Sequence, residues 1–369
     1  MIEHPDSLAN VVAAISKPES CYISSVVLLN ILTEYGLYQH FLPRMPADLS
    51  REPSQLACIT HHGVESIFAA ISAPEFSEDL DFFLRILELL LAHDEGKAAA
   101  PESALETLLT ALEVGEENFD NTLSLVSILA ALLSSSRFQT LTMKTPGMFL
   151  RVMDLIERSY DIKYDADREA KDKSLIMYAR SQLVEVVGEI ATDDEFRDVH
   201  PLDGEVMKRV SQWLKLRVGK EELSISACLV FGNIGRSDEA CLKLVEEKVH
   251  IPLLQVIGET ASKFEESVRQ IREKRTPEEK AKETPADQLP KGVMAVGIIH
   301  AAVGVLKNLA IPQDNKQKLV DADVFTTISQ LLRMEGVGVG QVWYSAVSLG
   351  RLVTIGTRMC FRPFQVAAS

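Results

Sequence analysis

Polar side chains that interrupt apolar helical runs are the residues of this chain with the clearest capacity for specific chemistry. Asn233 stands in the run A-C-L-V-F-G-N-I-G-R-S-D-E-A-C-L-K-L-V, and Asn308 has the same place in H-A-A-V-G-V-L-K-N-L-A-I-P-Q-D-N-K-Q-K-L-V. A side-chain amide both donates and accepts hydrogen bonds, so it suits the main chain of a bound extended segment. The chemistry expected of these residues is therefore binding.

Motifs typical of catalysis and of metal or nucleotide sites are missing from the sequence. It contains no G-x-x-x-x-G-K-[ST] phosphate loop, no G-x-S-x-G elbow and no H-E-x-x-H pair. His61 and His62 are adjacent, so they point apart on a helix and make a poor metal pair. The glycines Gly336, Gly338 and Gly340 lack the spacing of a dinucleotide-binding turn. We expect no metal, no cofactor and no catalytic side chains.

Composition narrows the class of protein and of partner. The 369 residues are 46% hydrophobic and carry a formal net charge of -15, which argues against a nucleic-acid binder and favours a basic partner. The five cysteines form no C-x-x-C pair, which indicates reduced, mostly buried thiols. The sequence shows no signal peptide and no uninterrupted apolar run of about 18 residues. We expect a cytoplasmic monomer without stable membrane insertion.

Positions equivalent to Asn233 recur along the chain in successive apolar helical runs. The interval is 43 residues between Glu88 and Ala131, 44 between Glu189 and Asn233, and 43 at the end of the chain. Longer intervals of 58, 58 and 75 residues indicate the same unit with insertions of about 15, 15 and 31 residues. The equivalent positions in order are Asn30, Glu88, Ala131, Glu189, Asn233, Asn308 and Arg351.

A period in the low forties, built from two or three helices, is typical of armadillo and HEAT solenoids. A polar position in an otherwise apolar third helix, followed by a tight turn, favours armadillo. We therefore predict an all-α, right-handed armadillo-repeat solenoid of six to seven repeats over residues 1–369. Its core between repeats should include Val230, Phe231, Val305 and Leu306.

Two segments depart from the repeat. Residues 263–291 are strongly charged and contain prolines at 277, 285 and 290, which indicates a helix extension followed by a mobile surface loop. The last residues, about 356–369, do not complete a repeat and form an atypical C-terminal tail.

The equivalent positions predict a binding groove, because third helices line the concave face of an armadillo solenoid. Glu189 is followed one turn later by Asp193 and Asp194, with Asn233 and Asn308 beyond them. Acidic side chains beside amides suit a basic, extended peptide. The alternative is that these polar residues are solvated helix ends. The candidate groove residues are Glu189, Asp193, Asp194, Asn233, Ser237, Asn308 and Arg351.

The two strings around Asn233 and Asn308 resemble the armadillo repeats of the Smg GDS family, the guanine nucleotide dissociation stimulators of Rho and Rap small GTPases. The resemblance extends over about Ser181 to Leu352. In that family a second asparagine follows the first by one turn and both are implicated in GTPase binding. Here Asn233 keeps the first, and Ser237 replaces the second.

The resemblance implies a partner and a mechanism. The partner would be a Rho/Rap-type small GTPase with a polybasic, prenylated C-terminal tail. The chain would promote GDP dissociation by preferring the nucleotide-poor state, or would chaperone the prenylated form. The alternative is a general armadillo scaffold or adaptor that binds basic peptides without exchange activity. An import receptor should carry groove tryptophans at regular intervals, and the chain has only Trp213 and Trp343.

Overall fold

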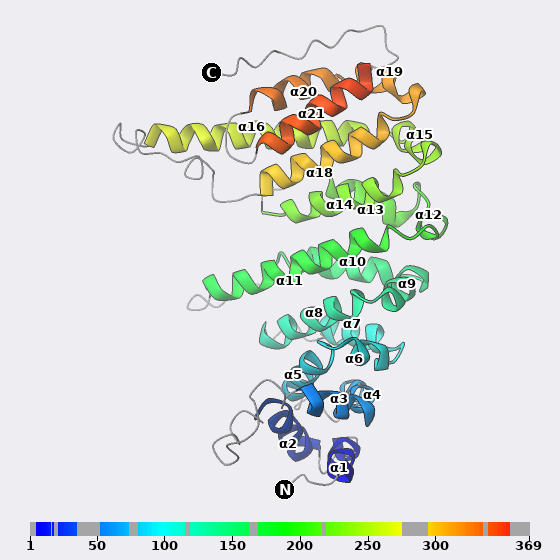
Figure 1. Ribbon diagram of the computed structural model, residues 1–369, viewed down its shortest axis with the longest axis vertical. Helices are drawn as coiled ribbons and strands as arrows, with labels where there is room; N and C mark the ends of the chain where they lie inside the picture. Colours follow the sequence, from blue (N-terminus) through cyan, green and yellow to red (C-terminus); the bar gives the residue numbers. More distant parts are fainter. Residues whose placement is uncertain are drawn as a thin grey trace. The chain divides into compact units, whose positions relative to one another are not determined.

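The computed structural model describes residues 5–15, 17, 21–34, 52–73, 80–114, 119–161, 169–215, 219–274, 294–334 and 339–354 (Figure 1). Every regular element in these ranges is an α-helix, which confirms the predicted all-α class. By its internal contacts the chain divides into two compact units, Met1–Val186 and Val187–Ser369, with the boundary inside a helix. The two units are therefore described separately.

The first unit repeats a group of three helices after an initial pair. Within it the third helix of one group packs against the third helix of the next, as α2 does on α5 and α5 on α8. Second helices are tied as well, since Arg151 of α10 donates to Glu106 and Glu113 of α7. The helices are α1 (Pro5–Ile15), α2 (Cys21–Glu34), α3 (Glu52–Thr60), α4 (Gly63–Ile71), α5 (Leu80–Leu90), α6 (Asp94–Ala99), α7 (Ala104–Val114), α8 (Phe119–Leu133), α9 (Ser136–Lys144), α10 (Met148–Arg158) and α11 (Glu169–Ile190).

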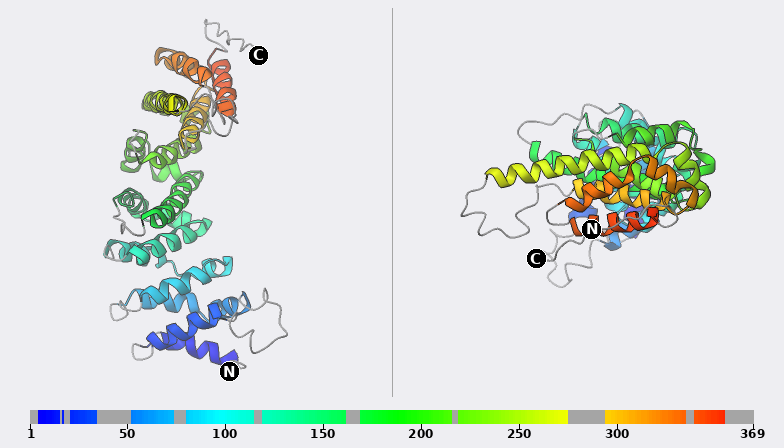
Figure 2. Two further views of the ribbon diagram at one scale, coloured as in Figure 1. Left: turned by 90° about the vertical axis from the view of Figure 1, so that its left-hand side faces the viewer. Right: turned by 90° about the horizontal axis from the view of Figure 1, so that it is seen from above.

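The second unit begins with the last turn of α11, which carries Gly188 and Glu189, and contains three further groups. The third helices α14, α18 and α21 pack in succession, and the second helices α16 and α20 form a layer beside them (Figures 1 and 2). The helices are α12 (Phe196–Val199), α13 (Glu205–Trp213), α14 (Glu221–Ile234), α15 (Asp238–Glu246), α16 (His250–Lys274), α18 (Met294–Leu309), α19 (Gln313–Asp321), α20 (Val324–Arg333) and α21 (Val339–Thr354).

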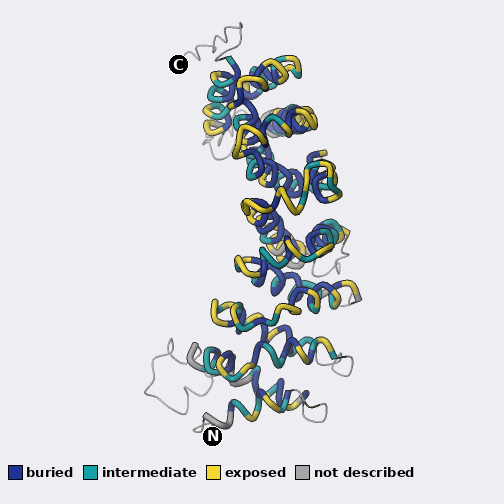
Figure 3. Tube along the Cα trace, turned by 90° about the vertical axis from the view of Figure 1, so that its right-hand side faces the viewer, coloured by how far each residue is buried: buried dark blue, intermediate teal, exposed yellow. Residues whose placement is uncertain are grey.

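The core between groups is the one that the apolar periodicity predicts. Buried and exposed residues alternate along the helices, because each helix buries only part of its surface (Figure 3). Val230, Phe231, Val305 and Leu306 are each at most 1% exposed, so the prediction for these four is confirmed. Within each unit, the helix groups stack one on the next as they do in an α-helical solenoid.

A glycine allows α11 and α14 to approach closely. A Cβ atom placed on Gly188 would lie 2.9 Å from the Cβ of Leu229, closer than two side chains can sit. The absence of a side chain at Gly188 therefore fixes how near the two helices lie, and this spacing matters for the contact described below.

The predicted insertion begins as a helix. α16 continues without a break to Lys274 and extends beyond its neighbours in Figure 1, in agreement with the predicted extension. The rest of the insertion, the C-terminal tail, Gly336, Gly338 and the side chain of Asn30 lie outside the described residues. Within the described ranges, no helix combines the length and the apolar character needed to cross a bilayer.

Candidate functional site

Two asparagines tie successive third helices together. Asn233 Nδ2 on α14 donates to the main-chain oxygen of Gly188 on α11 at 2.8 Å, and Asn308 Nδ2 on α18 donates to that of Gly232 on α14 at 3.3 Å. Gly188 directly precedes Glu189, just as Gly232 precedes Asn233. Each amide therefore reaches the residue before its own equivalent in the preceding group, which sets Glu189, Asn233 and Asn308 side by side.

These bonds satisfy carbonyl groups that a helix end leaves without a partner. The last four carbonyls of an α-helix lack an intrahelical donor, and Gly188 and Gly232 lie in the last turns of α11 and α14. The N–H of Thr192, which would continue the α-helical pattern to Gly188, donates instead to Glu189 at 2.8 Å. The asparagine nitrogens thus have a structural role that the sequence analysis did not include.

The positions equivalent to Asn233 include one on α21, the third helix of the last group. α21 packs on α18 and carries Arg351, which is exposed. Asn233 and Asn308 are half-buried, whereas Glu189 is exposed like Arg351. We call Glu189, Asn233, Asn308 and Arg351 the polar row. It is negative at its α11 end and positive at its α21 end.

The oxygen of Asn233 is also engaged within the protein. Arg236, three residues further on, donates from Nη2 to Asn233 Oδ1 at 2.7 Å. The nitrogen of this amide therefore has a partner in the preceding group, Gly188, and the oxygen has a partner in the turn that follows α14, Arg236. Sequence reasoning missed Arg236, although the i, i+3 spacing of an amide and an arginine is a readable signal.

Ser237 has a local role in the structure. It is the N-cap of α15, where its Oγ accepts from the N–H of Ala240 at 3.2 Å. The same oxygen accepts from Nη1 of Arg197 at 3.4 Å. A serine before two acidic residues is a common helix start, so this capping role follows from the sequence as well.

The acidic members of the predicted groove lie at the turn between α11 and α12. Asp193 and Asp194 are exposed, and Asp193 Oδ1 accepts from the N–H of Glu195 at 2.9 Å. The first turn of α15, which follows the end of α14, adds the exposed Asp238 and Glu239. Carboxylates in these two turns outnumber the cations among them, so the surface beside the polar row is acidic.

Two cations at this acidic surface lower the pKa of Glu239. Lys243 donates to its Oε1 at 2.9 Å, and this hydrogen bond lowers the pKa of Glu239 below its ordinary value. The positive charges of Lys243 and Arg197 act in the same direction. Glu239 therefore keeps its negative charge at neutral pH despite its acidic neighbours.

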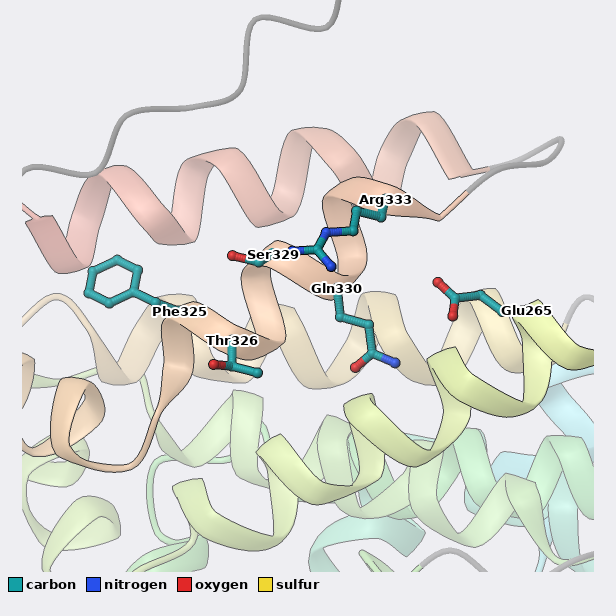
Figure 4. Close-up of a pocket in the computed structure, with 6 residues that line it drawn as sticks. All are labelled: Glu265, Phe325, Thr326, Ser329, Gln330 and Arg333. Carbon is teal, nitrogen blue, oxygen red and sulfur yellow. The ribbon is translucent and has the colours of Figure 1, made fainter.

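A cleft of about 410 Å³ lies between α16 and α20, in the layer of second helices of the second unit (Figure 4). Gln330 crosses it, donating to the oxygen of Gly258 at 3.4 Å and to Ser262 Oγ at 3.0 Å. No sequence pattern indicates this cleft, because its walls come from two second helices that are far apart in the chain. It is lined by Glu265, Phe325, Thr326, Ser329, Gln330 and Arg333.

Comparison with known proteins identifies no family. No protein-family model and no curated protein matches the chain. The crystal structure of an engineered protein from the Northeast Structural Genomics Consortium is 14% identical, with a TM-score of 0.31, over 95% of this chain and 97% of that chain. A structure from work on a phosphorylation switch controlling the interaction between cadherin and β-catenin is also 14% identical, with a TM-score of 0.32, over 95% of this chain and 73% of that chain.

Proposed function

We propose that this protein is an armadillo-type solenoid that binds a Rho/Rap-type small GTPase with a basic tail and either promotes GDP release or chaperones the prenylated form. The observation that carries the proposal is the polar row, in which the exposed Glu189 and two amides lie on successive third helices, with the exposed Asp193 and Asp194 in the turn beside them. The strings that resemble the Smg GDS family cover α14 with α15 and α18 with α19, the helices around that row.

The armadillo assignment is supported by the order of the helices within a group. A short first helix, a second helix and a third helix recur, and a tight turn joins α5, α8, α11, α14 and α18 to the group that follows each of them. The polar residue of each third helix stands within the last two residues before that turn in α11, α14 and α18. The predicted armadillo repeat likewise has its polar residue in the third helix, just before a tight turn.

The acidic turns supply an attraction for a basic tail. Exposed carboxylates act over about 10 Å at 0.1 M salt, so they raise the rate of encounter more than they slow dissociation. GDP release needs no catalytic side chain. It needs only a higher affinity of this protein for the nucleotide-poor GTPase, and by linkage the nucleotide then weakens binding in return.

The test is the release of fluorescent GDP from Rho, Rac and Rap proteins with and without this chain, together with stopped-flow binding. In the triple variant Glu189→Lys, Asp193→Lys and Asp194→Lys, association should be slower and less dependent on salt. The triple variant Asp203→Lys, Glu246→Lys and Glu247→Lys changes the net charge equally at exposed sites outside the polar row and its turns. It should bind with a rate closer to that of the unmodified protein.

The outcomes separate the alternatives. Equal slowing in both triple variants would mean that net charge alone attracts the GTPase and that the polar row is not the site. Binding without any GDP release would leave the adaptor or chaperone role. Absence of binding to every GTPase in the panel would contradict the proposal.

A further inference from the structure

The cleft between α16 and α20 contains two opposite charges that do not pair with each other. Glu265 lies on the α16 wall and Arg333 on the α20 wall, and both side chains are exposed (Figure 4). Within the ranges that the structure describes, neither of them has an ion pair or a side-chain hydrogen bond. A carboxylate and a guanidinium on opposite walls of one space suit a ligand that itself carries both charges.

The α20 wall offers donors for a negative group. Ser329 and Arg333 are four residues apart on α20, so they lie on the same face of the helix. Thr326, one turn before Ser329, donates to Asp323 Oδ1 at 2.8 Å, whereas the Ser329 hydroxyl has no hydrogen-bond partner among the described residues. A guanidinium and a hydroxyl one turn apart are suitable donors for a carboxylate.

The side of the cleft nearer to α16 offers acceptors for a positive group. Gln330 Nε2 donates to the main-chain oxygen of Gly258 at 3.4 Å and to Ser262 Oγ at 3.0 Å, so the amide nitrogen is held by α16. No residue in the described part of the chain donates to Gln330 Oε1. Ser262 and Glu265 are three residues apart on α16, so the Glu265 carboxylate lies on the same face as this amide. Both oxygens can accept from an ammonium group.

We propose that this cleft binds an aromatic α-amino acid, either free or within a short peptide that keeps both its charged ends. Its carboxylate accepts from Arg333 and Ser329, and its ammonium group donates to Glu265 and Gln330. Its ring lies toward Phe325, which lines the cleft one turn before Ser329. The cleft volume of about 410 Å³ is in the range of small-molecule sites. Because these residues lie on second helices, the site is separate from the polar row and does not depend on the proposed function.

Isothermal titration calorimetry of the full chain tests the site with two ligands. L-phenylalanine has its charges on one carbon atom, and glycyl-L-phenylalanine has them farther apart, so the pair tells the free amino acid from the short peptide. At least one should bind with a Kd of about 1 mM or below. Phenethylamine lacks the carboxylate and 3-phenylpropionate lacks the ammonium group. Each should bind at least about tenfold more weakly, because each leaves one charged wall without a partner.

Two single variants test the walls. Glu265→Gln and Arg333→Gln should each weaken binding at least about tenfold, the loss expected for a hydrogen bond to a charged group. Lys263→Gln is the matched control, because Lys263 is an exposed cation on α16 that does not line the cleft. It should bind like the unmodified protein, and circular dichroism checks the fold of each variant.

A third variant tests the site by a gain of binding. Glu265→Arg places a guanidinium on both walls, so it should lose L-phenylalanine and bind benzylsuccinate, a dicarboxylate with the same ring. No saturation with either ligand up to about 10 mM would overturn the inference. Equal binding of the ligands that lack one charge, equal affinities in the wall variants and Lys263→Gln, or no gain of benzylsuccinate binding would overturn it as well. None of these results bears on the binding of a GTPase.

Discussion

The side-chain nitrogen of Asn233 donates to the main-chain oxygen of Gly188 at 2.8 Å, and that oxygen belongs to the last turn of the preceding third helix. The amide therefore contributes to the stacking of helix groups before any partner arrives. Because Asn308 repeats the contact with Gly232 at 3.3 Å, the arrangement belongs to the repeat. A loss of binding in an asparagine variant can therefore be interpreted only when the free energy of unfolding of that variant has also been measured.

Asn233→Ala should lower the free energy of unfolding by about 0.5 to 1.5 kcal/mol, the usual net worth of one hydrogen bond. Asn308→Ala should cost less, because its bond to Gly232 is longer. Urea unfolding followed by circular dichroism measures the free energy of unfolding of both variants. The slope of this free energy against urea concentration should be the same as in the unmodified protein. Full stability in Asn233→Ala would mean that water replaces the amide at Gly188 without loss.

Two glycines on third helices should respond in opposite ways to alanine. Gly188→Ala brings a methyl group to 2.9 Å from the Cβ of Leu229, so α11 and α14 must separate, at a cost of about 1 to 3 kcal/mol. Gly304→Ala meets no atom and should stabilise α18 by about 0.5 to 1 kcal/mol. Thermal unfolding of the pair compares them directly. A stabilised Gly188→Ala variant would show that the helices separate without cost.

His250 should make the second unit less stable in mild acid. The residue is 5% exposed, and burial, with the positive charge of Lys318 as a smaller cause, lowers the pKa of His250 below its ordinary value of 6.5. Below that pH the unfolded chain takes up a proton that the folded protein resists, so the free energy of unfolding falls as pH falls. Above it neither state is protonated and the contribution is constant.

The measurement is urea unfolding at about pH 7.5 and about pH 5.5. His250→Gln should lose less stability between the two pH values than the unmodified protein. His300→Gln, at an exposed position on α18, is the matched control and should behave like the unmodified protein. An identical pH dependence in all three proteins would remove His250 as a cause.

The buried thiols should be inert in the folded protein. Burial raises the pKa of Cys58 and of Cys228 to about 12, and that of Cys241 to about 11, and the thiolate is the reactive form. In a Cys360→Ser background, Ellman's reagent at about pH 8 should label these residues only after urea is added. Rapid labelling without urea would indicate local opening of the helices that cover them.

The sequence predicted the elements of the second unit better than their contacts. Apolar periodicity located α14, α15 and α16, and the buried Phe231 and Val305 follow from the same pattern. The four described cysteines are buried free thiols, as predicted. The bond from Asn233 to Gly188 could not be predicted, because it depends on the rotamer of the amide and on the spacing of two helices 45 residues apart.

The nitrogen and the oxygen of each amide have separate consequences for the protein. The nitrogen holds the stack, so loss of the asparagine carries a penalty in every cell that folds the chain. The oxygen accepts from Arg236 in one group; in the next group, where Ile311 has the place of Arg236, no residue in the described part of the chain donates to it. A single substitution three residues after the asparagine can therefore add or remove a contact while the stacking bond stays intact. Surface chemistry and helix stacking can thus be altered separately at this position of the repeat.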